Sequence, residues 1–451
     1  MHLVKLTMLK FLPVLFVTFG FQLTAVAQEN SPYSRYGLGD LTPNHNILSR
    51  SMGGISAGVL DYQSINFVNP ASLGSLANTI FEMGAESDVR AIKSINPPQK
   101  FTSVNSLFSY LQLAFPVTPK KLLKKKVNWG MSFGLRPVSR INYKIENNKR
   151  LSGIDSLNTL YEGTGGVNQA FVGSGMSIDL SEDINHPKKF SAGINLGYMF
   201  GNKNYSTRLS FINDTVNYYR SLSSNQTNFG GFFINGGMQY ETSLAKGVLR
   251  LGIYGNLQQE IKASQDIVRE TISYDVTGAI YRVDSVSAQT GVKGTILFPS
   301  TVGLGFTYQG KHWLYGMDYE TTNWFNYKFF DESDQLQNSW MLRAGFQYFP
   351  ASEKKAAVKN YFNYVKYRAG IYYGKDYVIL NSSRPDYGIS FGTGMPLTSL
   401  QRINYGEYVL LNTAIEIGSR GDKRANLSEN VMRFSIGLSM NARWFQKRKY
   451  D

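Results

Sequence analysis

The segment from Val127 to Arg136 reads VNWGMSFGLR and alternates between two kinds of side chain. Its odd positions are large and apolar, whereas its even positions are mostly small or polar: Val127, Trp129, Met131, Phe133 and Leu135 against Asn128, Gly130, Ser132, Gly134 and Arg136. A period of two residues with different chemistry on the two faces predicts a β-strand. One face of this strand suits lipid and the other suits a polar lumen, as in a transmembrane β-barrel.

The same alternation recurs along the chain, for example in Phe190–Phe200 and in Phe434–Trp444. Marking every such segment predicts strands near 78–90, 104–117, 126–139, 166–183, 188–203, 226–241, 246–261, 291–309, 311–325, 337–350, 361–375, 384–396, 401–418 and 430–445. The fold class we predict is therefore all-β, an antiparallel transmembrane barrel of 14 strands. A soluble β-sandwich also alternates, but it does not need such large apolar residues on one face of strand after strand.

The connections between these segments differ in length. Those at 140–165, 204–225 and 262–290 are long, whereas those at 184–187, 242–245 and Gly310 are short. Outer-membrane barrels place long loops outside the cell and short turns in the periplasm. We expect the long connections to be extracellular loops.

The N-terminus has the features of a secretory signal. Lys5 and Lys10 precede an apolar stretch from Phe11 to Phe21, and the small residues Ala25-Val26-Ala27 follow. We expect cleavage before Gln28 and localisation in a Gram-negative outer membrane as a multi-pass barrel. The chain has no cysteine, which excludes a lipoprotein anchor and disulfides.

Residues 28–77 do not follow the barrel pattern. They are rich in glycine and proline, yet they carry Met52, Ile55, Val59, Phe67 and Leu73, more apolar side chain than a disordered leader usually has. We expect this segment, called the hatch below, to plug the lumen. The predicted organisation is a signal peptide at 1–27, the hatch at 28–77, the barrel at 78–445 and a periplasmic tail at 446–451.

Two blocks of sequence resemble a known family. The first comprises Arg50–Gly54, Asp61, Ser64 and Asn66–Leu73, with Asn69-Pro70-Ala71 as the hatch motif; the second comprises Phe298–Gly305, Trp313, Asp318 and Thr322–Trp324. Both look like parts of the FadL family of outer-membrane transporters for long-chain fatty acids and hydrocarbons. The final strand ending at Trp444-Phe445 also resembles the C-terminal strand of outer-membrane barrels, although six residues follow it.

The resemblance implies passive uptake of a hydrophobic molecule, a long-chain fatty acid or hydrocarbon, through a lumenal pocket with sideways exit into the membrane. An apolar ligand gains about 0.8 kcal/mol per CH₂ on leaving water. The alternative is a FadL-like barrel that does not transport but serves as a subunit of a larger secretion or barrel-assembly complex, since the family's pocket positions cannot be matched residue by residue.

A lateral exit needs a break in the hydrogen-bonded wall, which glycine or proline can provide. Gly130, Gly134 and Pro137, on the third predicted strand, are the candidates. The competing interpretation is that these small residues make room for the hatch.

Three arginines fall on lumenal faces of predicted strands near the extracellular side: Arg136, Arg343 and Arg433. They could hold the carboxylate or phosphate headgroup of a ligand by charge-assisted hydrogen bonds. Alternatively they pair with acidic hatch residues such as Asp40 or Asp61.

Enzymatic and cofactor functions are not expected. Gly54-Ile55-Ser56-Ala57-Gly58 matches the serine-hydrolase elbow, but that motif needs a strand-to-helix turn in an α/β sheet with a histidine in reach. The mature histidines, His45, His186 and His312, are scattered and form no metal-ligand cluster.

The net charge of +15 does not indicate nucleic acid as a partner, because a membrane-spanning chain rarely meets any. The densest basic run, Lys120, Lys121, Lys124, Lys125 and Lys126, falls in a predicted periplasmic turn. It suits either phospholipid headgroups of the outer membrane or an acidic periplasmic protein.

Overall fold

The computed structural model describes residues 31–442 except 96–97, 154, 182, 184–187, 214–215, 217, 352–360, 381, 399–407 and 422–426. The predicted signal peptide, the predicted tail and His186 lie outside the described residues. Among the helices described, none has the length and apolar character needed to cross a membrane.

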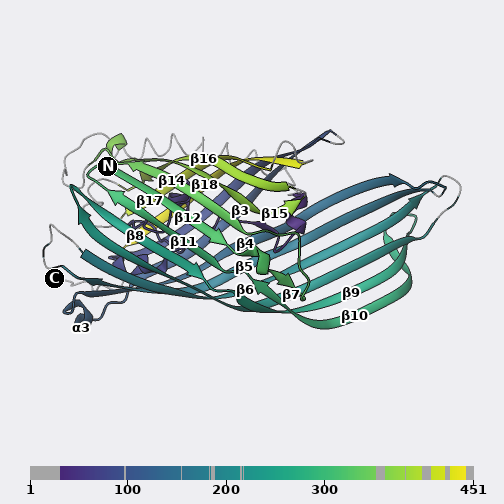
Figure 1. Ribbon diagram of the computed structural model, residues 1–451, viewed down its shortest axis with the longest axis horizontal. Coiled ribbons are helices and arrows are strands. Elements are labelled where there is room, and N and C mark those ends of the chain that lie inside the picture. Colours follow the sequence, from purple (N-terminus) through teal and green to yellow (C-terminus); the bar gives the residue numbers. More distant parts are fainter. Residues whose placement is uncertain are drawn as a thin grey trace.

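The strands form one closed antiparallel barrel (Figure 1). They are β2 (Thr79–Ser94), β3 (Gln99–Pro116), β4 (Val127–Arg150), β5 (Ser156–Asp179), β6 (Lys188–Ile212), β7 (Arg220–Leu244), β8 (Gly247–Asn256), β9 (Gln259–Tyr274), β10 (Ile280–Phe298), β11 (Thr301–Gln309), β12 (Trp313–Thr322), β14 (Ser339–Tyr348), β15 (Lys366–Leu380), β16 (Ser382–Pro396), β17 (Tyr408–Arg420) and β18 (Leu427–Ala442). The last strand closes the barrel on the first, since β18 pairs with β2 from Leu427 opposite Ser94 to Ala442 opposite Thr79.

Two of the barrel strands are interrupted. β8 and β9 are two parts of one strand, since both pair with β7. β10 and β11 are two parts of the next strand, since β10 pairs with β9 and β11 pairs with β8. The barrel has 14 strands when β8 with β9 and β10 with β11 are each counted as one strand. This count leaves out the two-residue strands β1 (Asp40–Leu41) and β13 (Lys328–Phe329). The predicted 14-stranded barrel is confirmed.

The prediction of long extracellular loops is wrong. Residues 140–165, 204–225 and 262–290 instead lie mostly in strands, because β4, β5, β6, β7, β9 and β10 continue far past the barrel and meet in hairpins. β6 and β7 each have 25 residues, whereas about 10 suffice to cross a bilayer. These extensions form a sheet, called the projecting sheet below, that rises from one side of the mouth (Figure 1).

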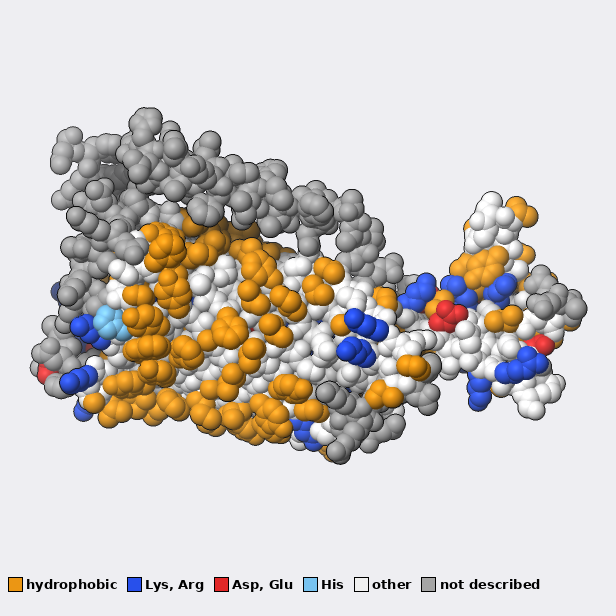
Figure 2. Space-filling model, turned by 90° about the horizontal axis from the view of Figure 1, so that it is seen from above, with side chains coloured by type: hydrophobic (Ala, Val, Ile, Leu, Met, Phe, Trp, Pro, Cys, Tyr) orange, Lys and Arg blue, Asp and Glu red, His pale blue; other side chains and the backbone are white. Residues whose placement is uncertain are grey.

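The outward surface of the barrel is apolar and the projecting sheet is not. Figure 2 shows hydrophobic side chains over the barrel part, whereas lysine, arginine and acidic side chains are interspersed on the projecting part. Along β6 the exposed Leu196, Tyr198 and Phe200 give way to Asn202 and Asn204. The change marks the membrane boundary and explains why the apolar alternation failed to reveal the extensions.

A polar contact joins two hairpins near the tip of the projecting sheet. Asn213 donates to Asp155 Oδ1 at 2.8 Å, and the Tyr218 hydroxyl donates to Asp155 Oδ2 at 2.9 Å. These two hydrogen bonds lower the pKa of the partly exposed Asp155 carboxyl. The contact ties the β4–β5 hairpin to the β6–β7 hairpin outside the membrane.

The hatch lies inside the barrel and is almost wholly buried. Its short elements are η1 (Pro32–Arg35), β1, α2 (Ile47–Arg50) and η2 (Pro70–Ser75). Its apolar side chains pack against one another and against inward-facing barrel residues; among the most buried large side chains are Leu38, Ile47, Leu48, Met52, Ile55, Ile65 and Leu73. Both Gly53 and Gly54 have positive φ, which lets the chain turn after α2 close to the wall.

The wall divides between β3 and β4. These strands pair only from Leu111 opposite Leu135 to Pro116 opposite Gly130, so above Leu135 the edge of β4 has no β3 partner. The hatch occupies this edge: β1 pairs with β4, Asp40 opposite Arg140, and the Thr42 amide donates to the Val138 carbonyl at 3.0 Å. The start of the hatch therefore acts as a short additional strand in the wall.

Candidate functional site

The hatch motif Asn69-Pro70-Ala71 begins the helix η2. Pro70 stands at the first helical position, and the Asn69 side chain caps the helix by accepting from the Ala71 amide at 3.2 Å. The same side chain donates to the Ala57 carbonyl at 2.8 Å. The motif thus connects two turns of the hatch, while further weak bonds from Asn69 reach the barrel carbonyls of Met238 and Ile253.

Buried ion pairs fasten the hatch to both sides of the barrel closure. Arg50, at the end of α2, binds Glu86 of β2 at 2.5 Å and Glu416 of β17 at 2.8 Å. Asp40 binds Arg90 of β2 at 2.8 Å and Arg420 of β17 at 2.7 Å. The hatch supplies the guanidinium group in the Arg50 pairs and the carboxylate in the Asp40 pairs, so the hatch and the wall are complementary in charge.

Other parts of the hatch are held at other points around the wall. Asp61 binds Lys366 of β15 at 2.8 Å. The Asp318 carboxylate of β12 accepts from the backbone amides of Ser56 and Ala57, at 2.5 and 2.7 Å. Ser56, the central residue of the elbow-like motif, is completely buried in this contact.

A polar cluster at Glu82 of β2 holds a fourth point. Its carboxylate accepts from the Ile65 amide at 2.8 Å, from the Ser64 hydroxyl at 2.9 Å and from the Tyr110 hydroxyl at 2.8 Å. Glu82 and Asp318 are buried barrel carboxylates that accept hydrogen bonds from backbone amides of the hatch. Each therefore fixes the position of a hatch loop that has no regular secondary structure.

The three predicted arginines face the lumen but have different surroundings. Arg343 binds Glu320 of the adjacent strand β12 at 3.0 Å, and Arg433 binds Asp88 of β2 at 2.7 Å. Arg136 donates to Gln169 at 2.9 Å and lies over the Phe67 ring of the hatch, 5.0 Å from its centre. Asp40 and Asp61, the hatch partners considered for these arginines, bind Arg90, Arg420 and Lys366 instead.

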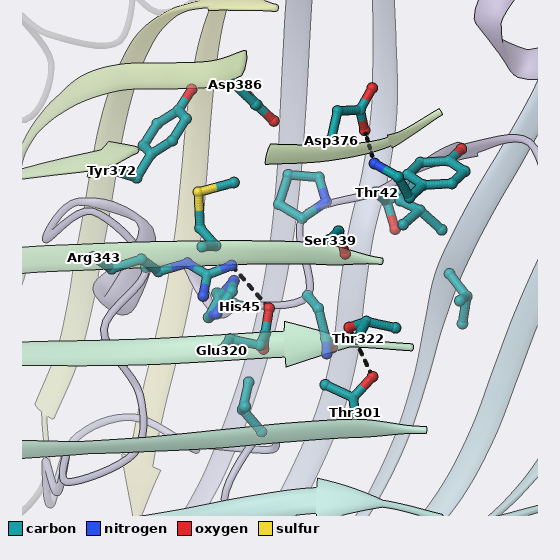
Figure 3. Close-up of a pocket in the computed structure, with 18 of the residues that line it drawn as sticks. Thr42, His45, Thr301, Glu320, Thr322, Ser339, Arg343, Tyr372, Asp376 and Asp386 are labelled. Atoms are coloured by element: carbon teal, nitrogen blue, oxygen red, sulfur yellow. Dashed lines mark hydrogen bonds and ion pairs between the residues drawn. The ribbon is translucent and has the colours of Figure 1, made fainter. Parts of the chain in front are cut away.

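A cavity of about 310 Å³ remains above the hatch, between Thr42–His45 and the wall (Figure 3). Glu320, Arg343, Tyr372, Asp376 and Asp386 line it. Figure 3 shows Arg343 directed at Glu320, with His45 of the hatch beside them. The cavity also reaches Phe67, Met199 and Phe298, but charged groups cover much of its lining.

The candidates for a lateral opening lie together on β4. A Cβ atom added at Gly130 would overlap the Leu73 carbonyl oxygen of the hatch, and one added at Gly134 would overlap the Phe171 ring. Pro137 lies at the register shift of β4, just above the division between β3 and β4, and its carbonyl accepts from the Thr42 hydroxyl at 2.8 Å. The hatch fills the space beside Gly130 and contacts Pro137, whereas Phe171 of the barrel fills the space beside Gly134.

The sequence did not reveal the groups that fasten the hatch. Arg50 and Asp318 fall in the family-like blocks, but nothing in the pattern connects Arg50 with Glu86, 36 residues away, or with Glu416. Glu82 and Glu86 occupy polar positions of a strand and are indistinguishable there from solvent-facing residues. No group of three or more histidine, aspartate or glutamate side chains in the described part of the chain is placed to hold a metal ion.

Comparisons with known proteins give a family and a fold. A model of the protein family described as BamG matches residues 8–451. A FadL homologue from Pseudomonas aeruginosa is similar in structure, with a TM-score of 0.55 and 11% identity over 89% of this chain and 99% of that one. The toluene transporter TodX of Pseudomonas putida gives 0.50 and 14%, covering 90% and 99%. A search of curated proteins finds no match. Identities this low show a shared fold alone.

Proposed function

This chain belongs to the BamG family, and from that membership we propose that it is a non-transporting, FadL-like subunit of the complex that assembles β-barrels in the Gram-negative outer membrane. Its proposed partners are therefore other proteins of the barrel-assembly complex. The structural observation that carries the proposal is the fastening of the hatch, which holds the lumen closed from several sides.

The fastening has an energetic consequence. Breaking one buried ion pair leaves an uncompensated charge and costs about 3–5 kcal/mol. Arg50 and Asp40 each hold two wall residues, and Asp61 and Asp318 hold further sites. A passage that opened by displacing the hatch would have to break several such contacts together. A barrel that serves as a rigid subunit gains stability from the same contacts.

Passive uptake of hydrophobic molecules is the competing function, and the shared fold with hydrocarbon channels is what favours it. The lumenal cavity gives it less support. Pockets for apolar ligands are lined mainly by apolar side chains with a few polar groups, whereas here Glu320, Arg343, Asp376 and Asp386 face the space. The hatch also occupies the wall edge through which a ligand would leave sideways.

The deciding experiment is purification from outer membranes in mild detergent by an affinity tag, with analysis of both proteins and small molecules. We expect barrel-assembly proteins in fixed stoichiometry, and a fall in the level of other outer-membrane barrels when this protein is depleted. A tagged barrel of unrelated fold is the control for detergent carry-over. Isolation as a single chain with a bound acyl chain or hydrocarbon, and unchanged barrel levels on depletion, would refute the proposal and favour uptake.

A further inference from the structure

Nine lysines lie at the end of the barrel opposite the projecting sheet. They are Lys120, Lys121, Lys124, Lys125 and Lys126 between β3 and β4, Lys188 and Lys189 at the start of β6, Lys246 between β7 and β8, and Lys311 between β11 and β12. All but Lys189 are exposed. At the opposite end β4–β7, β9 and β10 extend far beyond the apolar surface, as the extracellular parts of outer-membrane barrels do, and we therefore assign the lysine-bearing end to the periplasm.

These lysines, together called the basic arc below, lie on four connections that follow one another around the wall. Their strands are successive neighbours in the wall, in the order β3, β4, β5, β6, β7, β8, β11 and β12. The only acidic side chains described in the same connections are Asp179, which binds Lys189 at 3.6 Å, and Asp183. Among the described residues of this part of the rim, nine lysines therefore stand against two acidic side chains, and positive charge dominates.

The basic arc borders the apolar surface of the barrel directly. An exposed apolar side chain stands within two residues of a lysine at each connection: Leu123 is 55% exposed, Phe190 39%, Leu244 52% and Trp313 41%. In the short helix α3 (Lys120–Leu123) lysine and leucine are adjacent in the chain. Lysine side chains so placed extend along the apolar surface and hold the ammonium group at the level of lipid headgroups.

We propose that the basic arc binds the phosphate groups of anionic phospholipids in the periplasmic leaflet of the outer membrane. The charge is complementary, and its position at the edge of the lipid-facing surface suits headgroups better than a protein that docks from the aqueous side. Attraction of this kind amounts to about tenfold in affinity or less per lysine and is weakened by salt. The proposal does not depend on membership of the barrel-assembly complex.

Two tryptophans beside the arc, Trp129 of β4 and Trp313 of β12, provide a test. The purified full chain in neutral detergent is titrated with phosphatidylglycerol or phosphatidylcholine that carries brominated acyl chains, which quench nearby tryptophan fluorescence. We expect half-maximal quenching at a concentration of phosphatidylglycerol at least about tenfold lower than that of phosphatidylcholine. The difference should disappear in 0.5 M NaCl, as expected when the Debye length falls to a few ångström.

The variant that tests the arc carries Lys→Gln at 120, 121, 124, 125, 246 and 311. Its matched control carries Gln at six exposed basic positions of the projecting sheet: Lys149, Arg150, Lys262, Arg269, Arg282 and Lys293. The arc variant should lose the preference for phosphatidylglycerol, and the control, with the same net charge, should keep it. A smaller variant, Lys121→Gln with Lys124→Gln, should lose part of the preference if the larger one does not fold.

Equal quenching of the unaltered protein by the two lipids would overturn the proposal. Equal losses of the phosphatidylglycerol preference in the arc variant and the control would also overturn the proposal, because such losses would reflect net charge alone. If the arc variant keeps its lipid preference but no longer co-purifies with a periplasmic protein, the arc is a protein-docking surface and the lipid proposal is wrong. Co-purification of the unaltered chain tests the proposed function separately.

Discussion

Arg50 of the hatch and Glu86 of the first barrel strand form an ion pair whose side chains are only 1% and 2% exposed, with 2.5 Å between Nη1 and Oε2. Glu416 completes the arrangement from β17. A single hatch residue therefore connects strands on both sides of β18, the strand that closes the barrel.

Replacing Arg50 should test how strongly the hatch is held. In Arg50→Met, Glu86 and Glu416 lose their hatch partner, and we expect the free energy of unfolding to fall by about 3–5 kcal/mol. The measurement is thermal or denaturant unfolding in detergent, followed by tryptophan fluorescence. The control is Lys144→Gln, which removes an exposed pair with Glu162 and should cost about 0–1 kcal/mol. Equal effects would show that the Arg50 contacts do not hold the hatch.

The Arg343–Glu320 pair should behave as a structural unit. Arg343→Met or Glu320→Gln alone leaves one buried partner of the 3.0 Å contact unmatched, whereas the double variant removes both charges. We expect the double variant to be more stable than Arg343→Met by about 1 kcal/mol or more, a coupling measured by a double-mutant cycle. A purely additive result, together with weaker uptake of acids but not of neutral hydrocarbons in Arg343→Met, would support ligand headgroup binding by Arg343 instead.

Gly130 should tolerate no side chain. In Gly130→Ala the new methyl group would meet the Leu73 carbonyl, so η2 must shift, and we expect lower thermal stability and greater entry of small solutes into cells. Gly236→Ala is the matched control in β7, because the nearest atom to its added Cβ is 3.5 Å away. Unchanged permeability and stability in Gly130→Ala would mean that the hatch accommodates the methyl group without moving.

The absence of cysteine from the sequence makes the orientation of the barrel easy to test. Val276→Cys introduces a thiol at the fully exposed tip of the β9–β10 hairpin, and Lys121→Cys introduces one in the basic arc. A maleimide that cannot cross membranes should label the first variant in intact cells and the second only after lysis. Labelling of Lys121→Cys in intact cells would invert the topology and with it the assignment of the arc to the periplasm.

The tip contact at Asp155 should depend on pH. Its folded pKa is lowered by the hydrogen bonds from Asn213 and Tyr218, so the stabilisation is present above the ordinary aspartate pKa, about 3.9, and is lost as the pH falls through the lower folded value. Hydrogen exchange at the hairpin tips should be slower than in Asp155→Asn at pH 6, and the difference should vanish in strong acid. A difference that persists there would assign the protection to other contacts.

The number of strands was predictable because lipid imposes a period of two on one face, and segments such as 127–136 display it. The strand extensions of the projecting sheet were not predicted because their outward face is exposed to water and needs no apolar residues. In β6, for example, Asn202 and Asn204 stand where the barrel part has large apolar side chains. The three arginines line the lumenal cavity, but the sequence pattern left their partners open. Whether Arg433 meets Asp88 or a hatch carboxylate depends on strand register and on the path of an irregular segment, and neither is encoded in a local pattern.

The hatch also constrains the order in which the chain can fold. The Ser31 hydroxyl donates to Glu429 of β18 at 2.7 Å across 398 residues of sequence. Because its partner belongs to the last strand, the first described residue reaches its final place only after that strand is available, and contacts this distant in sequence form slowly. Until then Arg50 and Asp40 lack partners from β17. The contacts that hold the hatch therefore become available only when the whole barrel sequence is present, so the beginning of the chain waits for its end.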